Sequence, residues 1–258
     1  MKCLITSSVK KSVSEAADFA KILGTGLEIS RLPNTDRLDD DFDGIISDLK
    51  NSVKDFDGDI TLHALYSDLN PATKDAAIRK VVFRRYQQSF EAALAVKAQH
   101  VVFHSGHKGM KHKGSIEHYL KNSIIFWKEY IKQFEDNGIT AVMENVLEDA
   151  PDNILHIVDE VNSPNLKICL DTGHANLCSD IPHAEWIKRY GKRLAHVHVH
   201  NNFKTNDDHH GVKNGTVNFL NVFETIKSEE ISPYIVLEIF DEKELTESLE
   251  YLRKFNYV

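Results

Sequence analysis

The sequence predicts a single-domain α/β protein, a closed (β/α)₈ barrel spanning residues 1–258. Its length is typical of one such barrel. Short apolar runs alternate with longer amphipathic stretches from one end of the chain to the other, which is the pattern of βαβ units on a parallel sheet. Neither a GxGxxG motif after the first run nor a Walker A motif is present, and this disfavours a doubly wound nucleotide-binding sheet.

Eight runs are predicted to be strands because each is short and rich in apolar or β-branched residues. They are residues 2–7, 26–30, 59–65, 100–106, 140–146, 166–171, 194–200 and 234–240. The stretches between them have the apolar spacing of amphipathic helices. These are residues 14–23, 75–97, 116–137, 153–161, 184–192, 219–228 and 242–255. No linker or internal repeat indicates a second domain.

The net charge, the lengths of the apolar runs and the cysteine content limit the kinds of partner and the cellular location to be expected. The formal net charge of −8 argues against broad non-specific attraction to nucleic acid. The first apolar run is too short for a signal peptide and no run is long enough to cross a bilayer, so we expect a cytoplasmic protein. Three cysteines without CxxC spacing are expected to be buried reduced thiols.

Six successive predicted strands carry an ionisable residue at or near the end where active sites of such barrels lie. These residues are His63, His104, Glu144, Asp171, His198 and Glu238. Each one alone could be a core residue with a hydrogen-bond partner. Together they would crowd buried carboxylates and imidazoles, which is costly unless cations bind among them. Nitrogen and oxygen donors without thiolate favour Zn²⁺ first, with Mn²⁺ or another transition ion as the alternative.

The seventh predicted strand places three histidines on one face, because side chains alternate along a strand. We assign His198 as a metal ligand, His196 as a core residue and His200 as a rim residue that binds substrate. The following loop, residues 201–218, is long and contains Asp207 and His209; long loops are often functional. A solvated acidic turn is the alternative.

The loop of residues 105–113 adds positive charge near the barrel mouth. His107 and Lys108 within it are candidates for binding a substrate phosphate. The alternative is an ordinary solvated basic loop.

These residues resemble the xylose-isomerase-like barrel superfamily, which includes the endonuclease IV type of apurinic endonuclease and many sugar isomerases and epimerases. The resemblance covers about residues 59–240. Its most specific parts are the run Leu-Asp-Thr-Gly-His that ends at His174, the His198 strand with the Asp-x-His after it, and Glu238.

The resemblance to endonuclease IV implies up to three divalent cations, zinc first. The implied ligand groups are His63, His104 and Glu144; Glu144, Asp171, His198 and Glu238; and His174, Asp207 and His209. Tyr66 matches a position that contacts DNA in the endonucleases. The sequence departs from the endonuclease pattern at Gly173, where those enzymes have Cys, and at His200, where they have Asn. The stretch of residues 31–38, followed by Asp39, Asp40 and Asp41, is unfavourable for DNA phosphates.

Two activities follow from the resemblance. The first is hydrolysis of a phosphate ester or phosphodiester at a multinuclear site, with Glu144 orienting or deprotonating water. The alternative is isomerisation or epimerisation of a sugar or sugar phosphate with one cation, where Glu144 and Glu238 pass a proton on opposite faces of the substrate. A metal-binding or ligand-sensing barrel is the non-enzymatic alternative. The expected partner is a small phosphorylated or sugar substrate. DNA is disfavoured by the acidic charge, and the sequence leaves the oligomeric state open.

Overall fold

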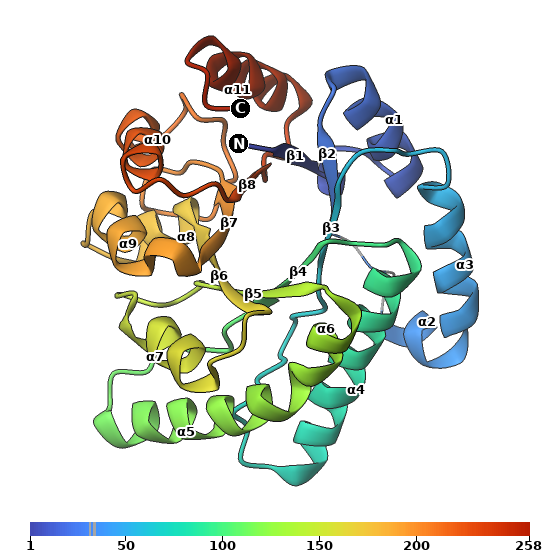
Figure 1. Cartoon of the computed structure of the whole chain (residues 1–258), viewed down its shortest axis with the longest axis vertical. Helices are drawn as coiled ribbons and strands as arrows, with labels where there is room; N and C mark the ends of the chain where they lie inside the picture. The colour runs from blue at the N-terminus through green and yellow to red at the C-terminus, as the bar shows by residue number, and fades with distance from the viewer. Residues whose placement is uncertain (31, 33–34) are drawn as a thin grey trace.

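The computed structural model describes residues 1–30, 32 and 35–258, and its strands form the predicted barrel. Eight parallel strands close in chain order, with β1 paired to both β2 and β8. Figure 1 shows the strands at the centre and the helices around them. The strands are β1 Cys3–Thr6, β2 Gly26–Ile29, β3 Ile60–His63, β4 His100–His104, β5 Thr140–Glu144, β6 Leu166–Asp171, β7 Leu194–Val199 and β8 Tyr234–Leu237.

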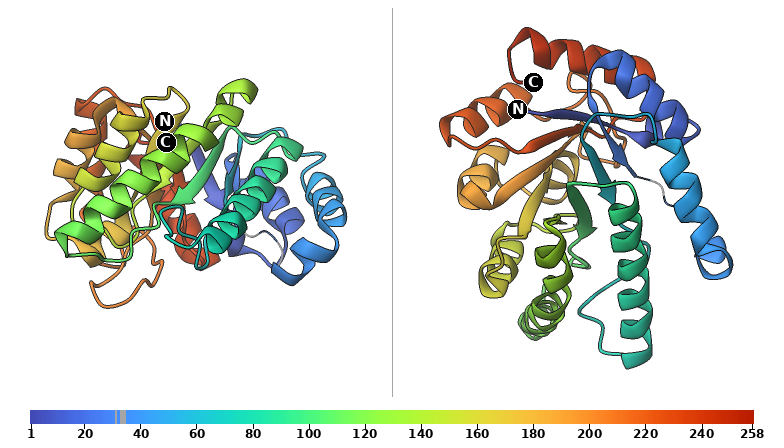
Figure 2. Two further views of the ribbon diagram at one scale, coloured as in Figure 1. Left: turned by 90° about the horizontal axis from the view of Figure 1, so that it is seen from below. Right: turned by 45° about the vertical axis from the view of Figure 1, so that its right-hand side comes forward.

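Helices cover the outside of the barrel, and the two chain ends lie side by side in every view (Figures 1 and 2). The α-helices are α1 Val13–Leu23, α2 Thr35–Asp40, α3 Phe42–Ser52, α4 Ala76–Ala95, α5 Lys113–Tyr130, α6 Lys132–Asn137, α7 Asp152–Val161, α8 Thr172–Cys178, α9 His183–Tyr190, α10 Phe219–Ser228 and α11 Glu242–Lys254. Short 3₁₀ turns occupy Ser7–Val9 and Gly191–Arg193. In the described part of the chain, no helix has both the length and the apolar character needed to span a bilayer.

Three helices were not predicted from the sequence, and one predicted helix is divided. The predicted helix of residues 116–137 is interrupted at Ile131, which separates α5 from α6. Helix α3 begins in the acidic stretch, where the Asp41 carboxylate accepts a hydrogen bond from the Gly44 N–H at 3.1 Å and caps the helix. Asp41 is therefore a capping residue. Arg31, Pro33 and Asn34, which belong to the same stretch, lie outside the described residues.

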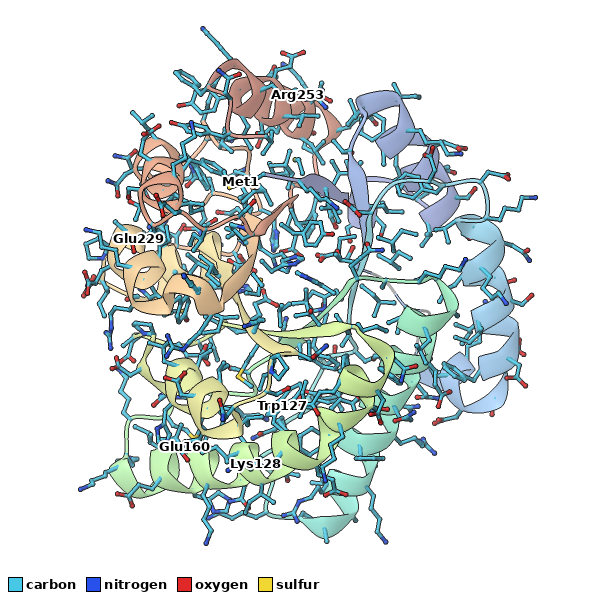
Figure 3. All side chains as sticks on the ribbon, viewed as in Figure 1. Met1, Trp127, Lys128, Glu160, Glu229 and Arg253 are labelled. Carbon is cyan, nitrogen blue, oxygen red and sulfur yellow. The ribbon has the colours of Figure 1, made fainter. Side chains whose placement is uncertain are left out.

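The core has two layers. Between strands and helices, Trp127 of α5 (Figure 3) is fully buried with its ring 5.3 Å from that of Phe103 on β4. Inside the barrel, Val102, Val142 and Cys169 form a second, smaller apolar cluster. All three cysteines are free, as expected, but only Cys169 is fully buried.

The pairing of β6 with β7 contains a register shift. Ile168 pairs with Leu194, and the next residue, Cys169, pairs with His196, so β7 holds one additional residue, Ala195, as in a β-bulge. Above the shift the pairing is regular and brings Asp171 beside His198.

Candidate metal centre

Four predicted ligands converge at the C-terminal end of the barrel. Glu144 ends β5, Asp171 ends β6, His198 lies on β7 and Glu238 follows β8 directly. The His198 Nδ1 atom is 3.2 Å from Glu144 Oε1, 3.1 Å from Glu238 Oε2 and 3.6 Å from Asp171 Oδ2. All four side chains are buried, and their ligand atoms lie within 4.8 Å of one another. These four residues, the central group, could share one ion.

A second set adjoins the central group through Glu144. His104 pairs with Glu144 across β4 and β5, and His63 reaches the same carboxylate from β3. The Glu144 Oε2 atom is 3.2 Å from His63 Nε2 and 3.4 Å from His104 Nε2, while Oε1 faces the central group. Glu144 therefore presents one oxygen to each of the two predicted sets.

The long loop after β7 returns to the barrel mouth. An isolated antiparallel bridge between Asn201 and His210 closes it. The loop thereby places Asp207 Oδ2 3.3 Å from His174 Nε2 and 3.2 Å from His209 Nε2. His209 has φ 52°, a conformation that is uncommon for residues other than glycine. His174 and His209, which with Asp207 are called the outer group, thus both face the same carboxylate oxygen of Asp207.

The histidine rings are oriented as metal ligands usually are. In His63, His174 and His209 the Nδ1 atom lies 2.8–3.0 Å from a backbone carbonyl oxygen, of Ala64, Asn145 and Glu238 respectively. Because only a protonated Nδ1 can donate to a carbonyl, the neutral ring presents the lone pair of Nε2 to the neighbouring carboxylate. Two acceptors face each other there, an arrangement that a cation between them would satisfy.

Charge in the site is balanced by histidine. Burial alone would raise the pKa of Glu144, but the charges of His198 and His104 outweigh it and hold that pKa well below its ordinary value. Burial would lower the pKa of His174, but Asp171, Asp207 and Glu144 raise it well above its ordinary value. Among the described residues, the ion pairs of the central carboxylates are all with histidines. Protons then occupy the positions that cations would take.

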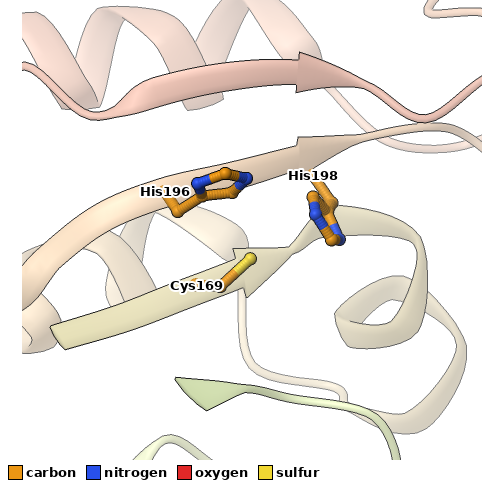
Figure 4. A group of neighbouring side chains, drawn as sticks. All are labelled: Cys169, His196 and His198. Carbon is orange, nitrogen blue, oxygen red and sulfur yellow. The ribbon is translucent and has the colours of Figure 1, made fainter. Parts of the chain in front are cut away.

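Sequence reasoning missed Glu28 on β2. Its carboxylate is fully buried inside the barrel, 3.0 Å from His198 Nε2 and 3.2 Å from His196 Nε2, and the Thr61 hydroxyl donates to it at 2.9 Å. The Nε2 atom of His198 thus lies beside Glu28, and its Nδ1 atom faces the central group. Figure 4 shows His196 and His198 along β7 with Cys169 beside them on β6. The signal that could have revealed Glu28 is its position as the one carboxylate in the apolar predicted strand of residues 26–30.

We expect Glu28→Gln to weaken divalent-cation binding about 10–100-fold, the usual effect of losing the partner that orients a ligand. A glutamine carbonyl can accept from only one of the two imidazoles, so His198 loses its fixed orientation. The measurement is competition for Zn²⁺ with a chromophoric chelator. Thr61→Val is the matched control, because it removes one donor to Glu28 and leaves both imidazole contacts. Equal affinities in the three proteins would contradict the role.

The predicted substrate-binding residues separate into two kinds. Tyr66 is half exposed, stacks on His104 at 4.4 Å and lines a mainly apolar cavity of about 540 Å³ beside His63. Lys108 is exposed on its loop. His107 and His200 are buried, so His200 lies deeper than the rim position expected for it, and substrate binding by either residue stays a prediction. The Nδ1 of His107 accepts from the Gly109 N–H at 3.2 Å. His196 is a core residue, as predicted.

Comparison with known proteins places this geometry in context. A family model described as a xylose isomerase-like TIM barrel matches residues 17–255. An uncharacterized protein of Methanocaldococcus jannaschii is 30% identical over 207 residues, 78% of this chain and 71% of that protein. A probable endonuclease 4 of Mycoplasmopsis pulmonis is 27% identical over 177 residues, 65% of this chain and 59% of that protein. The crystal structure of a D-tagatose 3-epimerase-like protein is 27% identical, with a TM-score of 0.83, and the match covers 99% of this chain and 97% of that one.

Proposed function

The chain belongs to the xylose isomerase-like TIM barrel family, and from this premise we propose that it is a divalent-metal-dependent epimerase or isomerase of a sugar or sugar phosphate. The convergence of Glu144, Asp171, His198 and Glu238 at one point carries the proposal. The likeness to a D-tagatose 3-epimerase-like protein over 99% of the chain supports it.

The donor set suits a transition-metal ion. Three carboxylates and one imidazole are the mixed oxygen and nitrogen ligands that Mn²⁺, Co²⁺ and Zn²⁺ accept. When bound, such an ion polarises a substrate carbonyl or hydroxyl and stabilises the negative charge that develops on oxygen. Glu28, whose carboxylate is 3.0 Å from His198 Nε2, helps to keep the Nδ1 atom of that ring turned toward the ion.

Proton transfer falls to the two glutamates. Glu144 arrives from β5 and Glu238 from the end of β8, so they approach the centre from well-separated strands. One carboxylate removes the proton from a carbon next to the substrate carbonyl, and the other returns a proton to the opposite face, so no net oxidation occurs. A positioned carboxylate contributes about 10²–10⁴-fold to such a step. His174, at the mouth beside Asp207, binds a substrate hydroxyl through Nε2.

The cavity beside His63 suits the body of a small sugar. Tyr66 presents an exposed aromatic face next to the metal ligands, and Ile78 and Val81 supply apolar wall. Aromatic and apolar surfaces pack against the C–H faces of a sugar ring, while the polar centre holds its oxygens. Lys108 is the candidate contact for a substrate phosphate.

Epimerisation or isomerisation is thereby preferred to phosphate-ester hydrolysis, the activity that the sequence alone placed first. The epimerase-like structure matches almost the whole chain, whereas the endonuclease relative matches 65% of it. The formal net charge of −8 also weighs against a long polyanion as substrate.

The test is solvent-proton exchange. The cation-loaded protein is incubated in deuterated water with a panel of ketoses and ketose phosphates, and the products are separated and analysed by NMR. We expect interconversion with one deuterium at the carbon that changes configuration or carbonyl position. Failure to produce either a new sugar or deuterium incorporation across the panel, with cation bound, would refute the proposal.

Hydrolysis of a phosphate ester is the second candidate, and one observation favours it. Glu144 offers its second oxygen to His63 and His104, and the outer group gathers around Asp207, so ligands for more than one ion are close together. Clustered ions suit phosphoryl chemistry. Elemental analysis showing three ions per chain, with turnover of a generic phosphodiester or of abasic DNA and none of ketoses, would favour this candidate.

A further inference from the structure

The side-chain amide of Asn145 takes the place of a strand residue beside Asp171. The pairing of β5 with β6 ends at Glu144 and Cys169, two residues before Asp171. On its other side Asp171 still pairs with His198 of β7. The Asp171 N–H donates to Asn145 Oδ1 at 2.9 Å, and Asn145 Nδ2 donates to the Asp171 carbonyl oxygen at 3.0 Å. The amide therefore supplies the acceptor and the donor that one more residue of β5 would have supplied.

The backbone of Asp171 decides which side chain suits residue 145. Asn145 and Asp171 are both buried, so their polar groups are removed from bulk water. A buried donor or acceptor left without a partner costs about 1–3 kcal/mol. An asparagine amide carries an acceptor and a donor in one plane, whereas an ionised aspartate could only accept. The amide thus satisfies both peptide groups at the point where the strand ladder has ended.

The carboxylate of Asp171 is held as firmly as its backbone. Its Oδ1 atom accepts from the His174 N–H at 2.7 Å and lies 2.9 Å from His200 Nε2. Its Oδ2 atom faces the central group, 3.6 Å from His198 Nδ1. The amide of Asn145 fixes the main-chain position from which this carboxylate extends.

The main chain of Asn145 adjoins two further predicted ligands. Asn145 follows Glu144 directly, and its carbonyl oxygen is 3.0 Å from Nδ1 of His174. One residue therefore connects candidate ligands from β5, β6 and α8. A substitution at residue 145 keeps the backbone carbonyl and removes only the amide contacts, so its first effect falls on Asp171.

We propose that Asn145 is a positioning residue for the cation of the central group, and that it acts through Asp171, whose backbone its amide holds in place. Groups that orient a ligating carboxylate usually contribute about 10–100-fold to cation affinity. The inference rests on the proposed function in so far as the central group binds a cation, but it does not depend on which substrate is converted.

A comparison of Asn145→Ala with Asn165→Ala tests the role. Asn165 lies at the opposite end of the same two strands, where its Nδ2 atom donates to the Ile139 carbonyl oxygen at 2.7 Å. Each variant loses a side-chain bond to the neighbouring backbone, so each should have a lower Tm. Mn²⁺ is the probe, because a carboxylate-rich donor set suits it.

We expect Asn145→Ala to raise the Kd for Mn²⁺ about 10–100-fold, measured from the electron paramagnetic resonance signal of the free ion. Asn165→Ala should change it by less than about twofold. Turnover of Asn145→Ala should also require correspondingly more Mn²⁺, a change that lower stability alone does not produce. Unchanged affinity in Asn145→Ala would overturn the inference, as would an equal loss of affinity in Asn165→Ala.

A measurement on the unmodified protein guards against a variant that fails to fold. In ¹⁵N-asparagine-labelled protein, Zn²⁺ should shift the side-chain amide resonances of Asn145 and leave those of Asn165 in place. Unmoved Asn145 resonances at full occupancy would also overturn the inference. An unmodified protein that binds Mn²⁺ but converts no sugar would refute the proposed function and leave this inference standing, whereas one that binds no cation would overturn both.

Discussion

Glu144→Gln is expected to abolish turnover while leaving the barrel folded. The substitution keeps the shape of the side chain but removes its charge and its capacity to accept a proton. Loss of a positioned general base costs about 10²–10⁴-fold in kcat. The loss should be larger here, because Glu144 also contacts His198 and His63 at 3.2 Å and helps to hold any ion among them. The measurement is the rate of deuterium incorporation at saturating cation, with far-UV circular dichroism and Tm on the same samples.

Glu148→Gln is the matched control for this variant. Glu148 is another buried glutamate, four residues further along the chain, but its carboxylate accepts from the Val146 N–H at 2.7 Å and from the Leu147 N–H at 3.1 Å. Its replacement should lower Tm, because a buried hydrogen-bonded group is disturbed, and should change the rate by less than about tenfold. Undiminished activity in Glu144→Gln would remove Glu144 from the mechanism.

Removal of divalent cations is expected to eliminate turnover and to lower the free energy of unfolding. An ion present at about 100 times its dissociation constant stabilises a folded protein by about 2.7 kcal/mol, and at about 1,000 times by about 4.1 kcal/mol. Exhaustive dialysis against a chelator should therefore lower the denaturation midpoint, and stoichiometric Zn²⁺ or Mn²⁺ should restore both stability and rate. A chelated protein with full activity and unchanged stability would exclude a metal role.

The metal-free protein should also lose stability as pH rises from 6 to 9. Burial lowers the pKa of His209, but its hydrogen bond to Asp207 and the charge of Glu238 raise the pKa to about 9. A histidine with a raised pKa stabilises the fold fully below its unfolded value of about 6.5, and this contribution disappears as pH passes about 9. The raised pKa of His209 contributes at most about 3 kcal/mol to the free energy of unfolding. Carboxylates with lowered pKa values, such as Glu144, act in the opposite sense and lose their contribution to stability in acid.

Cation affinity should rise between pH 6 and 9, because protons cease to compete for the histidine nitrogens. Denaturant titrations at pH 6 and 9, with and without Zn²⁺, measure both effects; a metal-free stability that is constant across this interval would contradict the assignment.

The barrel could be predicted because its signal is repeated along the chain. Each strand is a short apolar run bounded by polar residues, and the ionisable residues at the strand ends show where the mouth lies. The central group follows from this placement, since parallel strands end at one edge. Helix α8 could not be found in this way, because it follows β6 with no loop between them: Asp171 ends the strand, and its carboxylate caps the helix by accepting from the His174 N–H at 2.7 Å. One side chain serves as cap and as candidate ligand, and the sequence pattern reveals only one use.

The remaining differences arise from contacts between distant parts of the chain. Glu28 appears alone in its strand, and its partners on β7 are about 170 residues away, a relation that no local pattern contains. His200 was expected at the rim because it follows two inward-facing histidines toward the strand end. It is buried because the loop after β7 folds back and places His209 over it.

The register shift beneath the site decides which way these histidines face. Leu194 packs in the outer layer, and His196, an even number of residues later, faces Glu28 inside the barrel. Strict alternation would have put both on one side. Ala195 shifts the alternation of side chains by one residue. The strand therefore turns an apolar side chain outward at its base and ionisable side chains inward above it. Deletion of Ala195 should therefore make the strand regular and keep every pairing above it. Deletion of Val197 should instead turn His198, the neighbour of Asp171, toward the helices.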